Sequence, residues 1–135
     1  MSRLVVLAAL AMLGCRVPPY QPEVVALGAG SAPFATLANV VRARFPRLVV
    51  CDLEQRRLQS DWVEANDGAV PGRRRVSVFA TGPQSVGIVV ELAWLRQRID
   101  ATPYWSAPVG DRDAERELAA AVQSALGIAD VNRSP

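Results

Sequence analysis

The sequence contains no histidine and no lysine; all 15 of its basic residues are arginine, and they stand against 13 acidic residues. Histidine is the commonest general base and the commonest metal ligand, and it is the side chain that titrates near neutral pH. Its absence excludes histidine-based catalysis and a histidine pH switch. The formal net charge of +2 is also well below that of a typical nucleic-acid-binding protein. These absences predict a protein that is not an enzyme and does not bind nucleic acid.

The sequence also lacks an apolar run long enough to cross a bilayer, which takes about 20 residues. The longest run, Leu4 to Leu13, is about half that length. It follows Arg3 and is followed by Gly14 and Cys15. A short basic start, a short apolar stretch and a small residue before the cut are typical of a secretory signal peptide. We therefore predict that residues 1–14 are a signal peptide and not a membrane anchor.

The end of this run resembles the lipobox of bacterial lipoproteins. Leu13-Gly14-Cys15 has the small residue before the cut and the thiol after it, although Met12 stands where that family usually has leucine. The resemblance implies cleavage between Gly14 and Cys15, and acyl chains such as palmitate on Cys15. More than one acyl chain holds a protein stably on a membrane. Arg16, in place of an aspartate, favours the periplasmic face of the outer membrane over the inner membrane.

Only one further cysteine, Cys51, is present, so a lipidated Cys15 leaves no partner for an intramolecular disulfide. Cys51 ends the apolar stretch 48–51, and a cysteine in such a stretch is usually a small buried hydrophobe. No transition-metal site can be assembled from these residues. We expect no cofactor other than the covalent lipid on Cys15.

The rest of the chain is divided by its proline and glycine content. Residues 15–32 hold the lipidated cysteine and a Pro/Gly-rich tether, which would extend by about 3.1 Å per residue. Residues 33–127 are predicted to form one folded domain, and residues 128–135 a flexible tail.

Two helices and four strands are predicted within this domain. The first helix begins at Pro33, and the second is capped by Asp111 or Asp113 and ends at Gly127. The strand segments are 48–51, 58–65, 74–80 and 86–98. Amphipathic helices that bracket a sheet bury their apolar stripes most simply on one of its faces. We therefore predict an α+β fold: a two-layer sandwich with an antiparallel four-stranded meander and two helices on one face.

Acidic pairs and an arginine run are the remaining charged features. The acidic pairs are explained as solvated turn residues or helix N-terminal acids; they are Asp52 with Glu54, Asp61 with Glu64, and Asp111 with Asp113. The run Arg73-Arg74-Arg75 could contact anionic lipid or nucleic acid, but no aromatic residues are interleaved with it, as single-strand binders require. We interpret it as the outer face of a strand, and we assign no catalytic or metal-binding residue.

Aromatic residues give the one candidate binding surface. Tyr104 and Trp105 lie between Pro103 and Pro108, in a segment predicted to be a loop. Tryptophan and tyrosine are enriched at binding hot spots, so we assign Tyr104 and Trp105 as a candidate partner surface. The alternative is that this loop packs onto the sheet edge. Trp62 and Trp94 are interpreted as core residues.

The order helix, strands, helix resembles that of small bacterial outer-membrane lipoproteins with a BamC/NlpB-like domain. The resemblance covers about residues 32–127 and is one of pattern; its features are LGC at 13–15, PFATLANVVRARFP, LQSDWVEA, RRVSVFA, VGIVVELAW and DRDAERELAAAVQSAL. It implies a non-catalytic, accessory or structural component of a cell-envelope assembly, which acts through protein contacts. A competing resemblance to the lipoprotein LptE implies binding or transfer of a lipid or small ligand, in a groove between helices and sheet.

Overall fold

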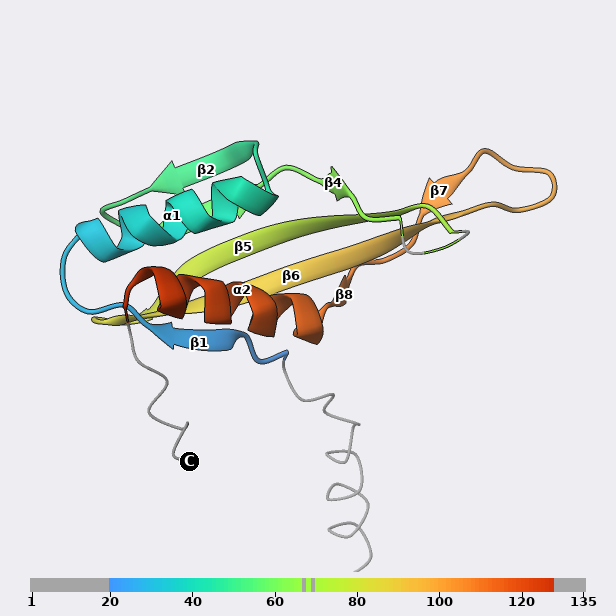
Figure 1. Cartoon of the computed structure of the whole chain (residues 1–135). Helices are drawn as coiled ribbons and strands as arrows, with labels where there is room; N and C mark the ends of the chain where they lie inside the picture. The colour runs from blue at the N-terminus through green and yellow to red at the C-terminus, as the bar shows by residue number, and fades with distance from the viewer. Residues whose placement is uncertain (1–19, 67, 69, 128–135) are drawn as a thin grey trace, which may run out of the picture.

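The computed structural model describes residues 20–66, 68 and 70–127, which form two helices and an eight-stranded antiparallel sheet (Figure 1). The predictions for residues 1–14, for Gly14 and Cys15, and for the tail 128–135 lie outside the described residues. The elements in chain order are β1 (Glu23–Ala26), α1 (Ala32–Arg44), β2 (Leu48–Asp52), β3 (Arg57–Ser60), β4 (Val63–Glu64), β5 (Gly72–Gly82), β6 (Ser85–Arg96), β7 (Tyr104–Trp105), β8 (Val109–Gly110) and α2 (Arg112–Ala125).

The long hairpin of β5 and β6 is the centre of the sheet. Its ladder runs from the pair Gly72 and Trp94 to the pair Gly82 and Ser85. The outer edge of β6 pairs with β1, β8 and β7, and the outer edge of β5 pairs with β3 and β4, while β2 lies beyond β3. Every shorter strand except β2 is therefore positioned directly by the hairpin.

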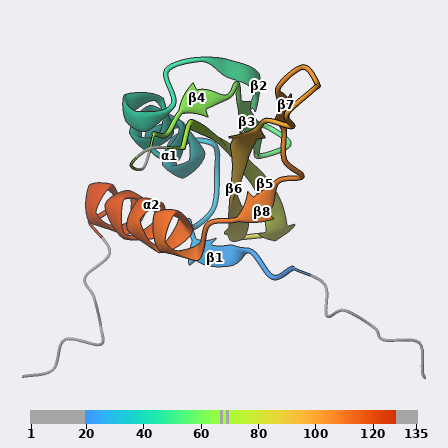
Figure 2. The same cartoon turned by 90° about the vertical axis from the view of Figure 1, so that its right-hand side faces the viewer.

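Both helices cover the same face of this sheet (Figures 1 and 2). The apolar stripe of α1 and the apolar side of α2 meet the inward-facing residues of β5 and β6 in one core. Burying a side chain of valine or leucine size stabilises the fold by about 1.5–3 kcal/mol. The buried residues are Phe34, Leu37, Ala38 and Val41 of α1, Leu118, Ala119 and Val122 of α2, and Val76, Val78, Val86, Ile88 and Val90 of the hairpin.

No helix among residues 20–66, 68 and 70–127 is long and apolar enough to cross a membrane.

The predicted α+β class is confirmed, but the predicted four-stranded meander is wrong because the sheet has eight strands. The four predicted strand segments do lie next to one another in the expected order. Three further strands come from segments predicted to be irregular: β1 from the tether, and β7 and β8 from the loop after β6. The sequence EVVA of β1 is short, does not alternate between apolar and polar residues, and follows Pro22, so it does not predict a strand. In the structure only Val25 of its residues is buried.

The predicted strand 58–65 is divided into β3 and β4 by one extra residue. Gln59 pairs with Ser77 and Val63 pairs with Arg74, so four steps on one strand match three on β5. At this bulge the hydroxyl of buried Ser60 accepts a hydrogen bond from the Val76 N–H at 3.0 Å. Bulges redirect side chains, and this one lies next to Trp62.

The start of α2 is fixed to the sheet by two charged residues. Asp111 caps the helix as predicted, since its carboxylate accepts a hydrogen bond from the Ala114 N–H at 3.1 Å. The same carboxylate pairs with Arg74 of β5 at 2.7 Å. Arg74 therefore points to the helix-covered side of the sheet.

A buried carboxylate holds the first described residue of the chain. Glu115 of α2 is fully buried and accepts hydrogen bonds from the Tyr20 hydroxyl, from the Val90 N–H at 3.1 Å and from Arg112 at 3.3 Å. The Tyr20 ring lies over Gly110, where an added Cβ would come within 2.1 Å of it. The chain therefore enters the domain at a fixed point beside the start of α2.

Replacement of Tyr20 by phenylalanine should alter the response of stability to high pH. Partial burial of the phenol and its hydrogen bond to Glu115 raise the pKa of Tyr20 from 10.0 to about 12. The folded state therefore keeps a proton that the unfolded chain releases, and the free energy of unfolding falls as the pH rises from about 10 to 12. Tyr20→Phe should lower stability at pH 7 by about 1 kcal/mol and flatten this decline.

Urea unfolding at pH 7 and across the alkaline range would measure both effects. The chain has no lysine, so no lysine side chain titrates in this window. As the matched control, Tyr104→Phe removes an exposed hydroxyl and should leave the stability at pH 7 unchanged. A Tyr20→Phe variant with the wild-type slope above pH 10 would contradict the assignment.

Candidate functional site

The candidate partner residues Tyr104 and Trp105 form the short strand β7, where a loop was expected. They pair with Arg96 and Leu95 of β6, and the two residues stay 44% and 37% exposed. The segment therefore packs on the sheet edge and still presents both aromatic rings to solvent.

Trp105 is part of a stacked cluster on the face of the sheet that the helices do not cover. The guanidinium carbon of Arg73 lies 4.2 Å from the centre of the Trp105 ring and 4.3 Å from the centre of the Trp62 ring. We call these three residues the Trp–Arg–Trp stack. Such contacts between a cation and an aromatic face stabilise by about 0.5–2 kcal/mol each.

Strand alternation places these side chains on one face. Successive residues of a strand point to opposite sides, so Arg73 and Arg75 lie opposite Arg74. Ala93 is the partner of Arg73 in the β5–β6 ladder, and Leu95, two residues further along β6, is the partner of Trp105. The arginine run was interpreted as one outer strand face without interleaved aromatics. It is instead divided between the two faces, and the fold brings aromatics onto one of them.

A further arginine extends the surface, since Arg75 lies 4.6 Å from the Trp62 ring and pairs with Glu91 at 2.5 Å. Tyr104 precedes Trp105 in β7 and points to the opposite side of the strand, where Arg98 lies 5.5 Å from its ring. The prediction of Trp62 as a core residue is wrong, because it is only partly buried and belongs to this surface.

Arg73 differs from its neighbours in lacking a carboxylate partner among the described residues. Arg74 pairs with Asp111 and Arg75 with Glu91. The Nε atom of Arg73 is buried and has no hydrogen-bond acceptor in the described part of the chain. A buried donor without an acceptor costs about 1–3 kcal/mol, so this nitrogen is a position where a ligand acceptor would be favourable.

A cavity of about 460 Å³ opens beside the stack. Strand β4 contributes one wall and β7 another, and the start of β5 lies between them. Its lining is mostly apolar. The lining residues are Trp62, Val63, Glu64, Asn66, Pro71, Gly72, Arg73, Leu95 and Trp105.

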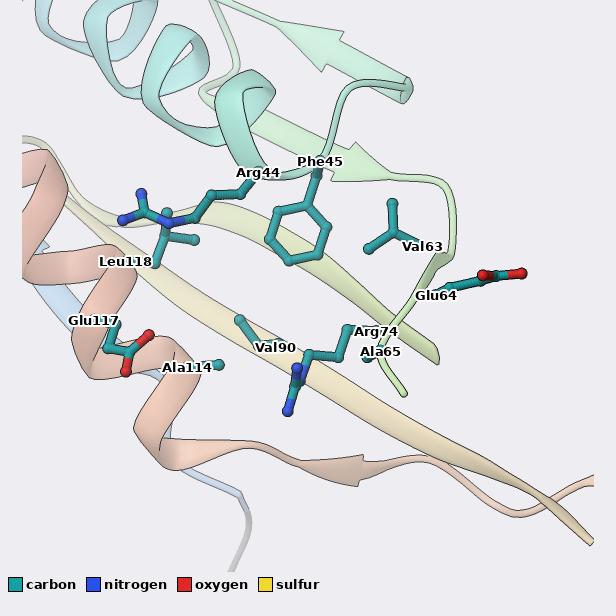
Figure 3. Close-up of a pocket in the computed structure, with 10 residues that line it drawn as sticks. All are labelled: Arg44, Phe45, Val63, Glu64, Ala65, Arg74, Val90, Ala114, Glu117 and Leu118. Carbon is teal, nitrogen blue, oxygen red and sulfur yellow. The ribbon is translucent and has the colours of Figure 1, made fainter. Parts of the chain in front are cut away.

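A smaller cavity of about 230 Å³ lies on the helix-covered side (Figure 3). It is the groove between helices and sheet in which a carrier would hold its ligand. Phe45 projects into it from the end of α1, whereas the Glu64 carboxylate points away from it (Figure 3). Ligand pockets for drug-sized molecules are about 300–1,000 Å³, so this cavity is smaller than that range.

Two residues of the predicted acidic pairs, Asp52 and Asp61, make contacts that stabilise the local structure. Asp52 accepts hydrogen bonds from the N–H groups of Glu54 and Gln55 at 3.0 and 2.9 Å, which closes the turn between β2 and β3. Asp61 pairs with Arg47 at 3.7 Å. Within residues 20–66, 68 and 70–127, no group of three or more His, Cys, Asp or Glu side chains could hold a metal ion.

Cys51 does not behave as the buried hydrophobe that was predicted. It is exposed on β2, with the Arg42 guanidinium 3.8 Å from its sulfur. The prediction failed because β2 is the last strand of the sheet order, and four of its five residues are exposed.

The sequence was compared with models of protein families and with curated proteins, and neither comparison gave a match. The surface is therefore interpreted from its geometry and chemistry alone.

A double-mutant cycle should detect the stacking energy between Arg73 and Trp105. We expect Arg73→Ala and Trp105→Ala to show a coupling energy of about 0.5–2 kcal/mol in the free energy of unfolding, because each removes one side of the same contact. Chemical denaturation of the wild type, the two single variants and the double variant measures it.

The matched control cycle pairs Arg73→Ala with Val109→Ala, because Val109 is exposed on β8 and is not in the stack. This control should show additivity. If the coupling energy between Arg73 and Trp105 is no larger than that of the control pair, the contact between these two side chains contributes nothing to stability.

Proposed function

We propose that this protein is a non-catalytic, lipid-anchored component of the bacterial cell envelope, which faces the periplasm and supports an envelope assembly through protein contacts. The observation that supports the proposal is the partly exposed Trp–Arg–Trp stack with its adjoining cavity. The strand register puts the stack on one face of the sheet, and both helices cover the other face (Figure 2).

The composition of this surface is that of a protein-binding hot spot. Tryptophan, tyrosine and arginine are the residues that contribute most binding energy at interfaces. Here Trp105 is held on the paired strand β7 and Trp62 lies just before β4, and both rings are packed against the Arg73 side chain. Tyr104, on the other side of β7, contacts Arg98. A surface whose side chains are already ordered loses less entropy when a partner binds.

The predicted anchor would hold this surface near the membrane. Tyr20 is five positions after Cys15, a distance of about 16 Å if such a Pro-containing segment extends by about 3.1 Å per residue. Tyr20 is fixed on α2 by Glu115. A lipid on Cys15 would therefore keep the domain close to the outer membrane and to partners that are bound there.

The second proposal, a lipid or small-ligand carrier of the LptE kind, has less support. Its groove between helices and sheet holds a cavity of only about 230 Å³. Lipid bound to the purified protein in addition to its own acyl chains, as measured by native mass spectrometry, would favour this second function over the first.

Truncation of the aromatic pair should remove the partner while leaving the fold intact. We expect the double variant Tyr104→Ala and Trp105→Ala to lose at least 90% of a crosslinked partner complex recovered from membranes, because hot-spot aromatics each contribute about 2 kcal/mol or more. The complex is measured by pull-down of the tagged protein and mass spectrometry. Circular dichroism would verify the fold.

Two controls accompany this experiment. Leu53→Ala alters an exposed apolar residue in the turn between β2 and β3 and should keep the complex. Cys15→Ala should lose both the acyl mass and the membrane location. Full retention of every partner by the aromatic double variant would refute the assigned surface.

A further inference from the structure

We propose that the Trp–Arg–Trp stack and its cavity form a recognition site for a carboxylate that lies next to an apolar group on the partner protein. The proposal deepens the protein-contact function given above and rests on it for the nature of the partner.

Both indole rings contact the Arg73 guanidinium, whose carbon lies 4.3 Å from the centre of the Trp62 ring and 4.2 Å from that of Trp105. A guanidinium binds an anion at its edge, where its N–H groups point. One of these groups, Nε–H, is buried and lacks an acceptor among the described residues. A carboxylate accepts two parallel hydrogen bonds from such an edge, in the bidentate geometry that pairs arginine with carboxylates.

The charges around Arg73 favour a ligand with one negative charge over a ligand with two. Arg75 is already paired with Glu91, whereas Arg73 has no acid partner among the residues that the structure describes and its Nε atom has no acceptor there. Glu64 is the β4 residue opposite Arg73 and also lines the cavity. Its negative charge would repel a phosphate dianion more strongly than a carboxylate monoanion.

The cavity supplies the apolar half of the site. Its volume of about 460 Å³ lies within the range of ligand pockets, and Leu95, Pro71 and Val63 line it beside the two indoles. A partner group with a carboxylate and an adjacent ring or branched chain would therefore place the acid on Arg73 and the apolar part in the cavity.

The test uses a matched pair of small probes, 4-phenylbutyrate and its neutral amide, with the purified acylated protein in lipid nanodiscs. The chain has 3 tryptophans, so tryptophan labelled with ¹⁵N gives three indole N–H signals. We expect 4-phenylbutyrate to shift the signals of Trp62 and Trp105 and to bind about tenfold or more tightly than the amide. Trp94, whose position in the ladder puts it on the opposite face, is the internal control.

Variants identify the residue that recognises the acid. Arg73→Gln should abolish the preference for acid over amide, while Arg116→Gln, which alters an exposed arginine of α2, should keep it. Glu64→Gln should strengthen binding of the acid several-fold, because it removes a like charge. If Arg73→Gln fails to fold, the Glu64→Gln result and the acid-to-amide ratio of the wild type still decide the question.

Equal binding of acid and amide, or no shift of Trp62 and Trp105 by either probe at 10 mM, would overturn the proposal. Tighter binding of phenyl phosphate than of 4-phenylbutyrate would also overturn it and would indicate a phosphate ligand such as a lipid headgroup. These measurements need no partner protein. If the pull-down finds no partner but the acid still binds more tightly than the amide, only the proposed function is refuted. If a partner is found but acid and amide bind equally, only the carboxylate site is refuted.

Discussion

The hydrogen-bonded ladder between β5 and β6 sets the position of every other strand in the sheet. It joins residues 72–82 to residues 85–96, and six shorter strands pair along its two edges or beyond them. Strands as short as β4, β7 and β8, with two residues each, have no independent stability. Their positions, and with them Trp62 and Trp105, follow from the register of this one hairpin.

The alternation of side chains along β5 gives the two faces of the sheet different chemistry. Val76 and Val78 enter the core, and Arg74 on the same side holds the capping residue of α2. Arg73 and Arg75 point to the other side, where no helix covers them. A register shift of one residue would exchange these sets and would bury Arg73 and Arg75 in the core. The stability of the core and the geometry of the Trp–Arg–Trp stack are therefore set by the same register.

Features with strong local signals could be predicted from the sequence, whereas features that depend on pairing could not. The stripes of both helices, the Asp111 cap and the alternation in β5 and β6 follow from spacing and residue type. The strands β1, β7 and β8 are short, flanked by proline or glycine, and formed only because β6 offers an unpaired edge. The stack was missed for the same reason: Trp62, Arg73 and Trp105 are far apart in the sequence. The alternation of Arg73 and Arg75 on one face was the available signal.

Site-specific photocrosslinking in intact cells would show whether the helix-free face contacts a protein. A photoreactive aromatic residue placed at Trp105 reports on this face, and one placed at Leu53 reports on the turn between β2 and β3. We expect a discrete protein adduct from position 105, absent from position 53 and lost with Arg73→Gln. Adducts with lipid alone at position 105, or the same protein adducts at both positions, would contradict a protein contact on this face.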